Sequence, residues 1–368
     1  MNLSNLSSPL LCPALQHMFG NHSLNSNTRA NMAVVSVHGL FSALGIAENA
    51  LILWVVGLRV RKTVAAVWVV NLALSDFLAT LTLPLFTYYL SVGHSWNLGE
   101  SLCVTQSAIF FLNMFFSAFL LAAISLDRCL LVVQPIWSKN HRSVATAWRV
   151  CGLGWLWAVA NALPYALFRS VTTKPDGRNL CYHNFARYSS ADSLKHDCWM
   201  RQNTTALSKF LLAFLLPLGV IAISYTSLTL KLRQRQRQRE FQAFATASRG
   251  RLALSSRRFS RMVVAVIAVF ILCWSPYHVV CLMEVAYQRS SDGMQTVAVA
   301  LPVATTLSFL NAVLNPILYT FSCPHFCVKI RESLGALLEG LLEEADGELL
   351  QCHCTPQDST TDGGRTNG

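Results

Sequence analysis

Long apolar runs dominate the chain and alternate with short polar segments. Seven of these runs contain few charged residues, and they cover residues 34–58, 67–90, 104–133, 150–168, 206–230, 262–285 and 297–321. The hydrocarbon core of a bilayer is about 30 Å thick, and about 20 residues of α-helix are needed to cross it. The pattern therefore predicts an all-α membrane protein with a bundle of seven transmembrane helices.

The segments outside these runs differ in character. Residues 1–33 are polar and are expected to form a glycosylated segment outside the membrane, whereas residues 34–321 form the predicted bundle. Apolar side chains then recur at every fourth position, which predicts a short amphipathic helix on the membrane surface over residues 322–340; they are Phe326, Ile330, Leu334 and Leu338. Residues 341–368 become acidic and then rich in Ser, Thr and Gly, which is typical of a disordered cytoplasmic tail.

Composition supports a membrane protein. Hydrophobic residues make up 53% of the 368 residues and charged residues only 13%, with a mean hydropathy of +0.41. So little polar surface could not cover the apolar side chains in water. The net charge of +11 comes from Lys and Arg placed between the apolar runs rather than on a soluble face, so we exclude nucleic acid as a partner.

The distribution of charge predicts which terminus is cytoplasmic. Lys and Arg are concentrated in the first, third and fifth connections and in the tail, and such segments remain on the cytoplasmic side. Seven spans then place the N-terminus outside the cell, and we expect a multi-pass protein of the plasma membrane. All the Asn-X-Ser/Thr glycosylation sites fall on the predicted outer side: Asn2, Asn5, Asn21 and Asn203.

Four of the 12 cysteines also fall on the predicted outer side. Cys103 precedes the third run and Cys181 lies in the fourth connection, so the two can form a disulfide that ties this loop to the third helix. Cys12 and Cys198 then remain. They either form a second bridge or stay as two unpaired thiols, and the oxidising compartment favours the bridge.

Polar side chains inside the runs are costly in hydrocarbon and need a partner or a water-filled cavity. Six of them would meet if the helices pack as one bundle: Asn49, Asp76, Asn113, Ser117, Asn311 and Asn315. A carboxylate among amides and hydroxyls offers the hard oxygen ligands that suit a sodium ion. The same residues could equally form a hydrogen-bonded network without an ion, and the sequence leaves both readings open.

Three short motifs lie where helices could move or meet a partner. Asp127 and Arg128 close the third run at its cytoplasmic end, where they can pair with each other, release the Arg to a partner, or simply extend it to the interface. Prolines interrupt the sixth and seventh runs and remove helical hydrogen bonds, so each creates a hinge or a static kink. These two motifs are Cys273-Trp274-Ser275-Pro276 and Asn315-Pro316-Ile317-Leu318-Tyr319.

In their order along the chain, these residues resemble the rhodopsin-like family of G-protein-coupled receptors, and its chemoattractant branch in particular. The resemblance covers about residues 34–338 and rests on Asn49, Leu72-Ala73-Leu74-Ser75-Asp76, Cys103, Asp127-Arg128, Trp155, Pro217, Tyr225 and the two proline motifs. Cys129 departs from it, because most of the family has Tyr there. The resemblance implies that conformational switching and G-protein coupling involve Asp127, Arg128, Tyr225, Trp274, Pro276, Asn315, Pro316 and Tyr319.

Two cations stand where a ligand would enter from the outer side. Arg169 follows the fourth run, and Lys209 lies within the fifth. A carboxylate ligand is the natural partner of an ammonium in an apolar run. Alternatively, Arg169 extends to the interface and Lys209 pairs with Glu284 of the sixth run. Aromatic residues on the outer halves of the runs suit the apolar part of such a ligand: Phe86, Tyr89, Phe110, Phe111, Tyr182, Trp274, Tyr277 and Phe309.

Finer stretches, such as residues 109–115 and 208–214, resemble prostaglandin-binding members of the chemoattractant branch. The resemblance implies that a ligand carboxylate is held by Arg169, Tyr182 and Lys209, and that apolar contacts come from Phe86, Phe110, Tyr277 and Phe309. Two positions depart, since His183 replaces a Tyr and Gln106 replaces a His. Recognition of the carboxylate is therefore expected to be weaker, pH-sensitive through His183, or adapted to a related acid.

The resemblance implies a receptor for an acidic lipid mediator, above all prostaglandin D2, that signals through inhibitory G proteins in chemotaxis or inflammation. A chemotactic peptide or another acidic metabolite is the alternative ligand. A transporter would show internal repeats or several midplane charges, and only Asp76 and Lys209 qualify. We expect no enzyme and no cofactor beyond a sodium ion. Hydroxyl residues of the tail are candidate phosphorylation sites for arrestin binding: Thr355, Ser359, Thr360 and Thr361.

Overall fold

The computed structural model describes residues 11–20, 28–242, 251–287, 290–322 and 332. The chain divides into two units, Met1–Ser322 and Cys323–Gly368, and the fold described below is that of the first. The amphipathic helix predicted over residues 322–340 and the tail predicted over 341–368 lie outside the described residues, apart from Ser322 and Glu332.

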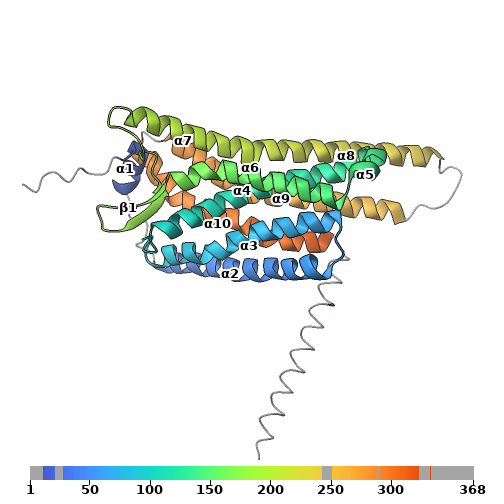
Figure 1. The fold of residues 1–368 in the computed structure, drawn as a ribbon, viewed down its shortest axis with the longest axis horizontal. Helices are drawn as coiled ribbons and strands as arrows, with labels where there is room; N and C mark the ends of the chain where they lie inside the picture. The colour runs from blue at the N-terminus through green and yellow to red at the C-terminus, as the bar shows by residue number, and fades with distance from the viewer. Residues whose placement is uncertain (1–10, 21–27, 243–250, 288–289, 323–331, 333–368) are drawn as a thin grey trace, which may run out of the picture. The chain divides into compact units, whose positions relative to one another are not determined.

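Helices account for nearly all of the described chain (Figure 1). The elements of the first half are α1 (Pro13–Gly20), α2 (Thr28–Trp54), the π-helical segment η1 (Val55–Arg59), α3 (Val64–Ser91), α4 (Glu100–Val133), α5 (Pro135–His141) and α6 (Val144–Leu167). Those of the second half are β1 (Arg169–Thr173), β2 (Asn179–His183), α7 (Leu194–Phe210), η2 (Leu211–Leu215), α8 (Leu216–Gln242), α9 (Arg251–Ala286) and α10 (Ser291–Ser322). Seven helical segments of the described chain are long and apolar enough to cross a membrane, which confirms the predicted fold class.

Two of the spans begin earlier than their apolar runs because a side chain caps the helix. The hydroxyl of Thr63 accepts a hydrogen bond from the backbone N–H of Ala66 at 3.1 Å, so α3 starts at Val64. Ser143 caps α6 in the same way through Thr146. Each cap satisfies a backbone donor that the first helical turn leaves without a partner, and hydropathy alone does not detect it.

The fifth span is one continuous helix made of α7, η2 and α8. It begins at Leu194, twelve residues before the predicted start at 206, inside a polar stretch. The π-helical turn lies directly before Pro217, and the backbone N–H of Leu216 bonds to the carbonyl of Leu211 five residues earlier. Such a turn shifts the register of side chains around the helix axis, which determines how Lys209, just before it, faces the bundle.

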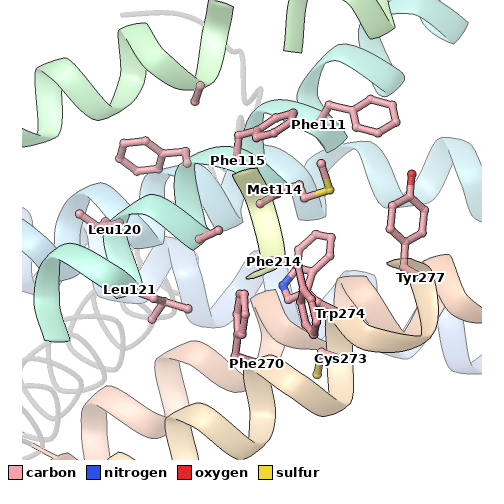
Figure 2. Packing of buried hydrophobic residues seen from close by; sticks show 14 of the residues in the cluster. Phe111, Met114, Phe115, Leu120, Leu121, Phe214, Phe270, Cys273, Trp274 and Tyr277 are labelled. Atoms are coloured by element: carbon pink, nitrogen blue, oxygen red, sulfur yellow. The ribbon is translucent and has the colours of Figure 1, made fainter. Parts of the chain in front are cut away.

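The core lies between α4 and the helices that pack on it (Figure 2). The rings of Phe116 and Trp155 stack with their centroids 3.9 Å apart, so α4 and α6 come close together. Gly154 permits this approach, because a Cβ there would lie 2.6 Å from the ring of Phe119. On the other side of α4, Figure 2 shows Phe214 of η2 and Trp274 of α9 turned toward the same core.

A short hairpin and two disulfides shape the end of the bundle at which α1 lies (Figure 1). Strands β1 and β2 pair antiparallel. The Cys103–Cys181 disulfide joins β2 to the start of α4, and Cys12–Cys198 joins the residue before α1 to α7. All four cysteines predicted on the outer side are thus bridged. Arg169, predicted at the end of the fourth span, instead opens β1.

Candidate functional site

A cavity opens at the hairpin end of the bundle, between α3, α4, α7, α9 and α10. The empty space between its walls, including the solvent at its open mouth, amounts to about 1050 Å³. The strands of the hairpin contribute part of its wall. Nine of the ten residues that the sequence suggested for the ligand line this one cavity: Phe86, Tyr89, Phe110, Phe111, Arg169, Tyr182, Lys209, Tyr277 and Phe309. Trp274, the tenth, is not one of its lining residues.

Lys209 is the most unusual group in this cavity. It is only 5% exposed, and its Nζ lies 5.4 to 5.6 Å from the ring centroids of Phe111, Tyr165 and Tyr277. Its hydrogen-bond partner in the structure is the thiol of Cys281, at 3.4 Å. Aromatic faces attract a cation, but neither they nor a thiol neutralise its charge as a carboxylate would. The site is therefore prepared for an anion beside Lys209.

Glu284 of α9 lines the same cavity but forms no direct ion pair with Lys209 within the described chain. Its carboxyl accepts a hydrogen bond from Gln202 at 3.3 Å and also interacts with the hydroxyl of Tyr182. The alternative in which Glu284 pairs with Lys209 is therefore not what the structure has. Glu284 nonetheless lies close enough for its charge to act on Lys209, so it offsets part of that charge without a direct contact.

Arg169 and His183 face each other across the hairpin. The Nη1 of Arg169 lies 3.4 Å from His183 Nε2, and its guanidinium lies 5.7 Å from the centre of the Tyr182 ring. Burial, followed by the cations Arg169 and Lys209, holds the pKa of His183 well below its usual range. His183 is therefore neutral at physiological pH, and the expected pH sensitivity through this residue does not follow from its surroundings.

Aromatic rings form the floor of the cavity and continue into the core. The ring of Phe110 lies 5.2 to 5.4 Å from those of Phe111, Tyr277 and Phe309. It also lies 6.1 Å from Trp274, which is buried one layer deeper. A ligand that displaces Phe110 would therefore press directly on Trp274, next to the proline within α9.

Asp76 lies at the centre of a buried polar cluster below this floor. Its Oδ1 accepts from Asn113 at 2.9 Å and from Ser117 at 3.4 Å, and its Oδ2 accepts from Asn315 at 2.8 Å. The side-chain atoms of Asn311 are buried with no hydrogen-bond partner in the described chain. Four of the six predicted residues are thus brought together, namely Asp76, Asn113, Ser117 and Asn315, whereas no hydrogen bond joins Asn311 to them.

Asn49 does not join this cluster, contrary to the grouping in the sequence. Its Nδ2 donates to the backbone carbonyls of Gly45 and Ala312, at 2.9 and 3.1 Å. The amide therefore ties α2 to α10 through the backbone. The sequence does not show whether the side chain of Asn49 points toward Asp76, because this depends on how α2 is rotated about its axis.

At the other end of the bundle, Asp127 pairs with Arg142 rather than with Arg128. The guanidinium of Arg142 holds both carboxylate oxygens of Asp127, at 2.8 and 3.2 Å. The hydroxyl of Ser125, two residues before Asp127 on α4, donates a hydrogen bond to the hydroxyl of Tyr225 at 3.4 Å. Pro276 and Pro316 both lie within continuous helices, and the side chain of Tyr319 lies outside the described residues.

The predicted glycosylation sites are mostly beyond the described part of the chain. Asn2, Asn5 and Asn21 lie outside the described residues. Asn203 lies in α7, where it is half-buried and its amide donates to the carbonyl of Trp199 at 2.6 Å.

Sequence reasoning missed several residues around Lys209 because nothing in the sequence marks them as part of a site. Tyr165 stacks on Phe111 with centroids 4.0 Å apart and donates from its hydroxyl to the carbonyl of Thr205. Cys281 lies within the sixth apolar run, where a small residue is typical of packing, but its thiol faces Lys209. Gln202, the partner of Glu284, was missed because it precedes the apolar run that begins at residue 206, whereas the helix itself already begins at Leu194.

Residues 48–319 match the family described as 7 transmembrane receptor (rhodopsin family). The match covers more than half of the chain, from the last turns of α2 into α10. The chain belongs to the rhodopsin family of seven-transmembrane receptors. This receptor is thus a multi-pass membrane protein whose partners are a ligand and a G protein, and its relatives are receptors rather than enzymes.

Two relatives share nearly half of the residues of this receptor. Prostaglandin D2 receptor 2 of Mus musculus is 46% identical over 344 residues, covering 93% of this chain and 86% of the relative. The same receptor of Rattus norvegicus is also 46% identical, covering 93% and 81%. Chemerin-like receptor 1 of Rattus norvegicus is 31% identical and covers 86% of this chain and 82% of the relative. The receptor therefore falls among chemoattractant-type receptors.

Proposed function

We propose that this receptor binds an acidic lipid mediator, prostaglandin D2 above all, in the cavity beneath the hairpin. The observation that carries the proposal is Lys209, a buried ammonium surrounded by aromatic rings without a carboxylate of the described chain paired to it. A ligand carboxylate supplies the missing negative charge, and Arg169 reaches the same cavity from β1. The 46% identity to two prostaglandin D2 receptors supports this ligand class.

The apolar part of the ligand then lies against the aromatic floor. Phe86, Phe110, Tyr277 and Phe309 line the cavity and offer the contact area that an acyl chain and a ring need. Contact with Phe110 transmits binding to Trp274 and the helix that carries it. A ligand that binds the active arrangement more tightly shifts the population toward it.

The remaining parts of the proposal concern orientation and partners. The hairpin and the two disulfides face the extracellular side of the plasma membrane, because disulfides persist in that compartment. At the opposite end, Arg128 and the inner ends of the helices contact a G protein of the inhibitory class, and the tail recruits arrestin. Chemotaxis or inflammation is the response expected of such a chemoattractant-type receptor.

A sodium ion also fits the proposal. Asp76 supplies a carboxylate, Ser117 a hydroxyl oxygen, and Asn311 an amide oxygen that has no partner in the described chain. These hard oxygen donors suit a small cation and have little to offer a transition metal.

The experiment measures cyclic AMP in cells that express the receptor. Prostaglandin D2 is compared with other acidic lipids and with chemerin-type and formylated peptides, with and without pertussis toxin. The proposal expects an acidic lipid to lower cyclic AMP at the lowest concentration, and the toxin to abolish the effect. A response to peptides alone would move the receptor to the peptide class, and a toxin-resistant lipid response would contradict the inhibitory G protein.

A further inference from the structure

A buried lysine in the turn of the hairpin has no role in the proposed ligand site. Lys174 follows β1 and closes a tight turn in which its N–H donates to the carbonyl of Arg178 and its carbonyl accepts from Gly177. Lysines in turns normally extend into water, yet Lys174 is only 3% exposed. Its ammonium has no hydrogen-bond partner in the described chain. Such a group is costly unless an acceptor is bound to it.

The nearby carboxylate is not free to serve as that acceptor. Asp176 accepts from the Nε and Nη2 of Arg178, at 2.9 and 2.6 Å, and also from its backbone N–H. The two side chains thus neutralise each other, and the charge of Lys174 remains. Burial, followed by the charge of Arg178, lowers the pKa of Lys174 to about 8, and Asp176 offsets this in part. The ammonium is therefore still mostly protonated at neutral pH.

The hairpin turn is joined to the loop between α3 and α4, which brings a second buried donor close by. Arg178 donates through Nη1 to the carbonyl of Gly93 at 3.2 Å, and the N–H of Trp96 donates to Asn179 at 2.8 Å. Between these two contacts lies His94, which is 8% exposed and whose Nδ1 is buried without a partner in the described chain. Burial, then the charges of Arg178 and Lys174, lower the pKa of His94, so its ring is neutral and can donate one N–H.

We propose that Lys174 and His94 hold a small inorganic anion, chloride or a similar halide, between the hairpin turn and the α3–α4 loop. Both donors are more than nine-tenths buried, which restricts the occupant to a small ion. The local charge is positive, because Asp176 is matched by Arg178 while Lys174 is not. His94 also lines the rim of the ligand cavity, but Arg169 and Lys209, which we assign to the ligand carboxylate, are not part of this anion site.

The test measures the thermal midpoint of the purified receptor without any lipid ligand. Sodium chloride is replaced by sodium bromide or by sodium gluconate at constant ionic strength. Wild type is expected to melt at a higher temperature in the halides, with a saturable dependence on their concentration. Lys174→Met should abolish this dependence, whereas Lys195→Met, which removes an exposed lysine of α7, should keep it. Equal midpoints in chloride and gluconate, or a halide response retained by Lys174→Met, would overturn the proposal.

A second measurement needs no variant, in case Lys174→Met does not fold. The halide response of wild type should be present at pH 7 and lost above about pH 8 to 9, because the ammonium of Lys174 is then deprotonated. Asp176 stays ionised and His94 stays neutral in this range, because the pKa of each lies below it. A response of constant size up to pH 9.5 would contradict the assignment. If acidic lipids raised the thermal midpoint in a way that required Lys174, while halides had no effect, the proposal would be overturned and Lys174 would be a ligand contact instead.

Discussion

Lys209→Met separates a residue that recognises the ligand from one that merely supports the fold. Methionine keeps the length and volume of the side chain but removes the charge that lies among three aromatic rings. An ion pair or charge-assisted hydrogen bond to a ligand carboxylate is worth about 1.5 to 3 kcal/mol. The variant should therefore bind an acidic lipid about 10- to 150-fold more weakly.

The stability of the ligand-free receptor should respond differently. The variant loses cation–π contacts with the rings, each worth about 0.5 to 2 kcal/mol, and the hydrogen bond to Cys281. It also avoids the cost of burying an ammonium that has no carboxylate partner, which is of similar or larger size. The thermal midpoint without ligand should thus stay unchanged or rise, even though affinity falls.

Radioligand competition on membranes gives the affinity, and melting of the purified receptor gives the stability. Lys195→Met is the matched control, because it removes a lysine from the exposed start of the same helix. It should leave both quantities unchanged. If Lys209→Met bound the acid as tightly as wild type, or lost affinity only in proportion to a lowered midpoint, the role assigned to Lys209 would be refuted.

Three further predictions concern other parts of the receptor. Asp76→Asn should abolish the effect of sodium, relative to choline at constant chloride, on ligand affinity; a sodium effect that persists in the variant would place the ion elsewhere. Arg142→Ala breaks the partly exposed ion pair with Asp127 and should lower the thermal midpoint by about 1 to 3 °C. The control Lys139→Ala should not change it, and a midpoint of Arg142→Ala equal to that of wild type would show that the pair contributes nothing to stability. The folded-state pKa of His183 is depressed, so the unfolded form binds a proton first on acidification and the receptor loses stability below about pH 6.5. The thermal midpoint of wild type should therefore fall further between pH 8 and pH 5 than that of His183→Gln, and parallel melting curves over this range would contradict this.

The sequence was sufficient for those features that depend on local pattern. Each span is a long apolar run, and lipid requires every buried backbone group to be satisfied within its helix, so seven runs can only become seven helices. The pairing of Cys103 with Cys181 followed from the compartment that both share. Arg169 and Lys209 stood out by their charge, whereas the roles given to the aromatic residues came largely from a resemblance, since the pattern alone leaves each aromatic residue as a core residue.

Other features depend on rotation and distance between helices, which the pattern does not contain. Asn49 faces the backbone of α10 instead of Asp76, and Asp127 pairs with Arg142, the residue that follows α5, rather than with its sequence neighbour. The hydrogen bond from Lys209 to Cys281 joins residues 72 positions apart. The hydrophobic periodicity of the sequence gives no sign of these contacts, because each depends on how the helices pack against one another.

The central claim is that this receptor holds the carboxylate of an acidic lipid in the cavity beneath the hairpin. The most direct test is equilibrium binding of prostaglandin D2 and of its uncharged primary amide to the purified receptor under identical conditions. The account predicts saturable binding of the acid at one site, with the amide about 10- to 150-fold weaker in wild type. Equal affinities for the acid and the amide would contradict it, as would the absence of saturable binding of the acid.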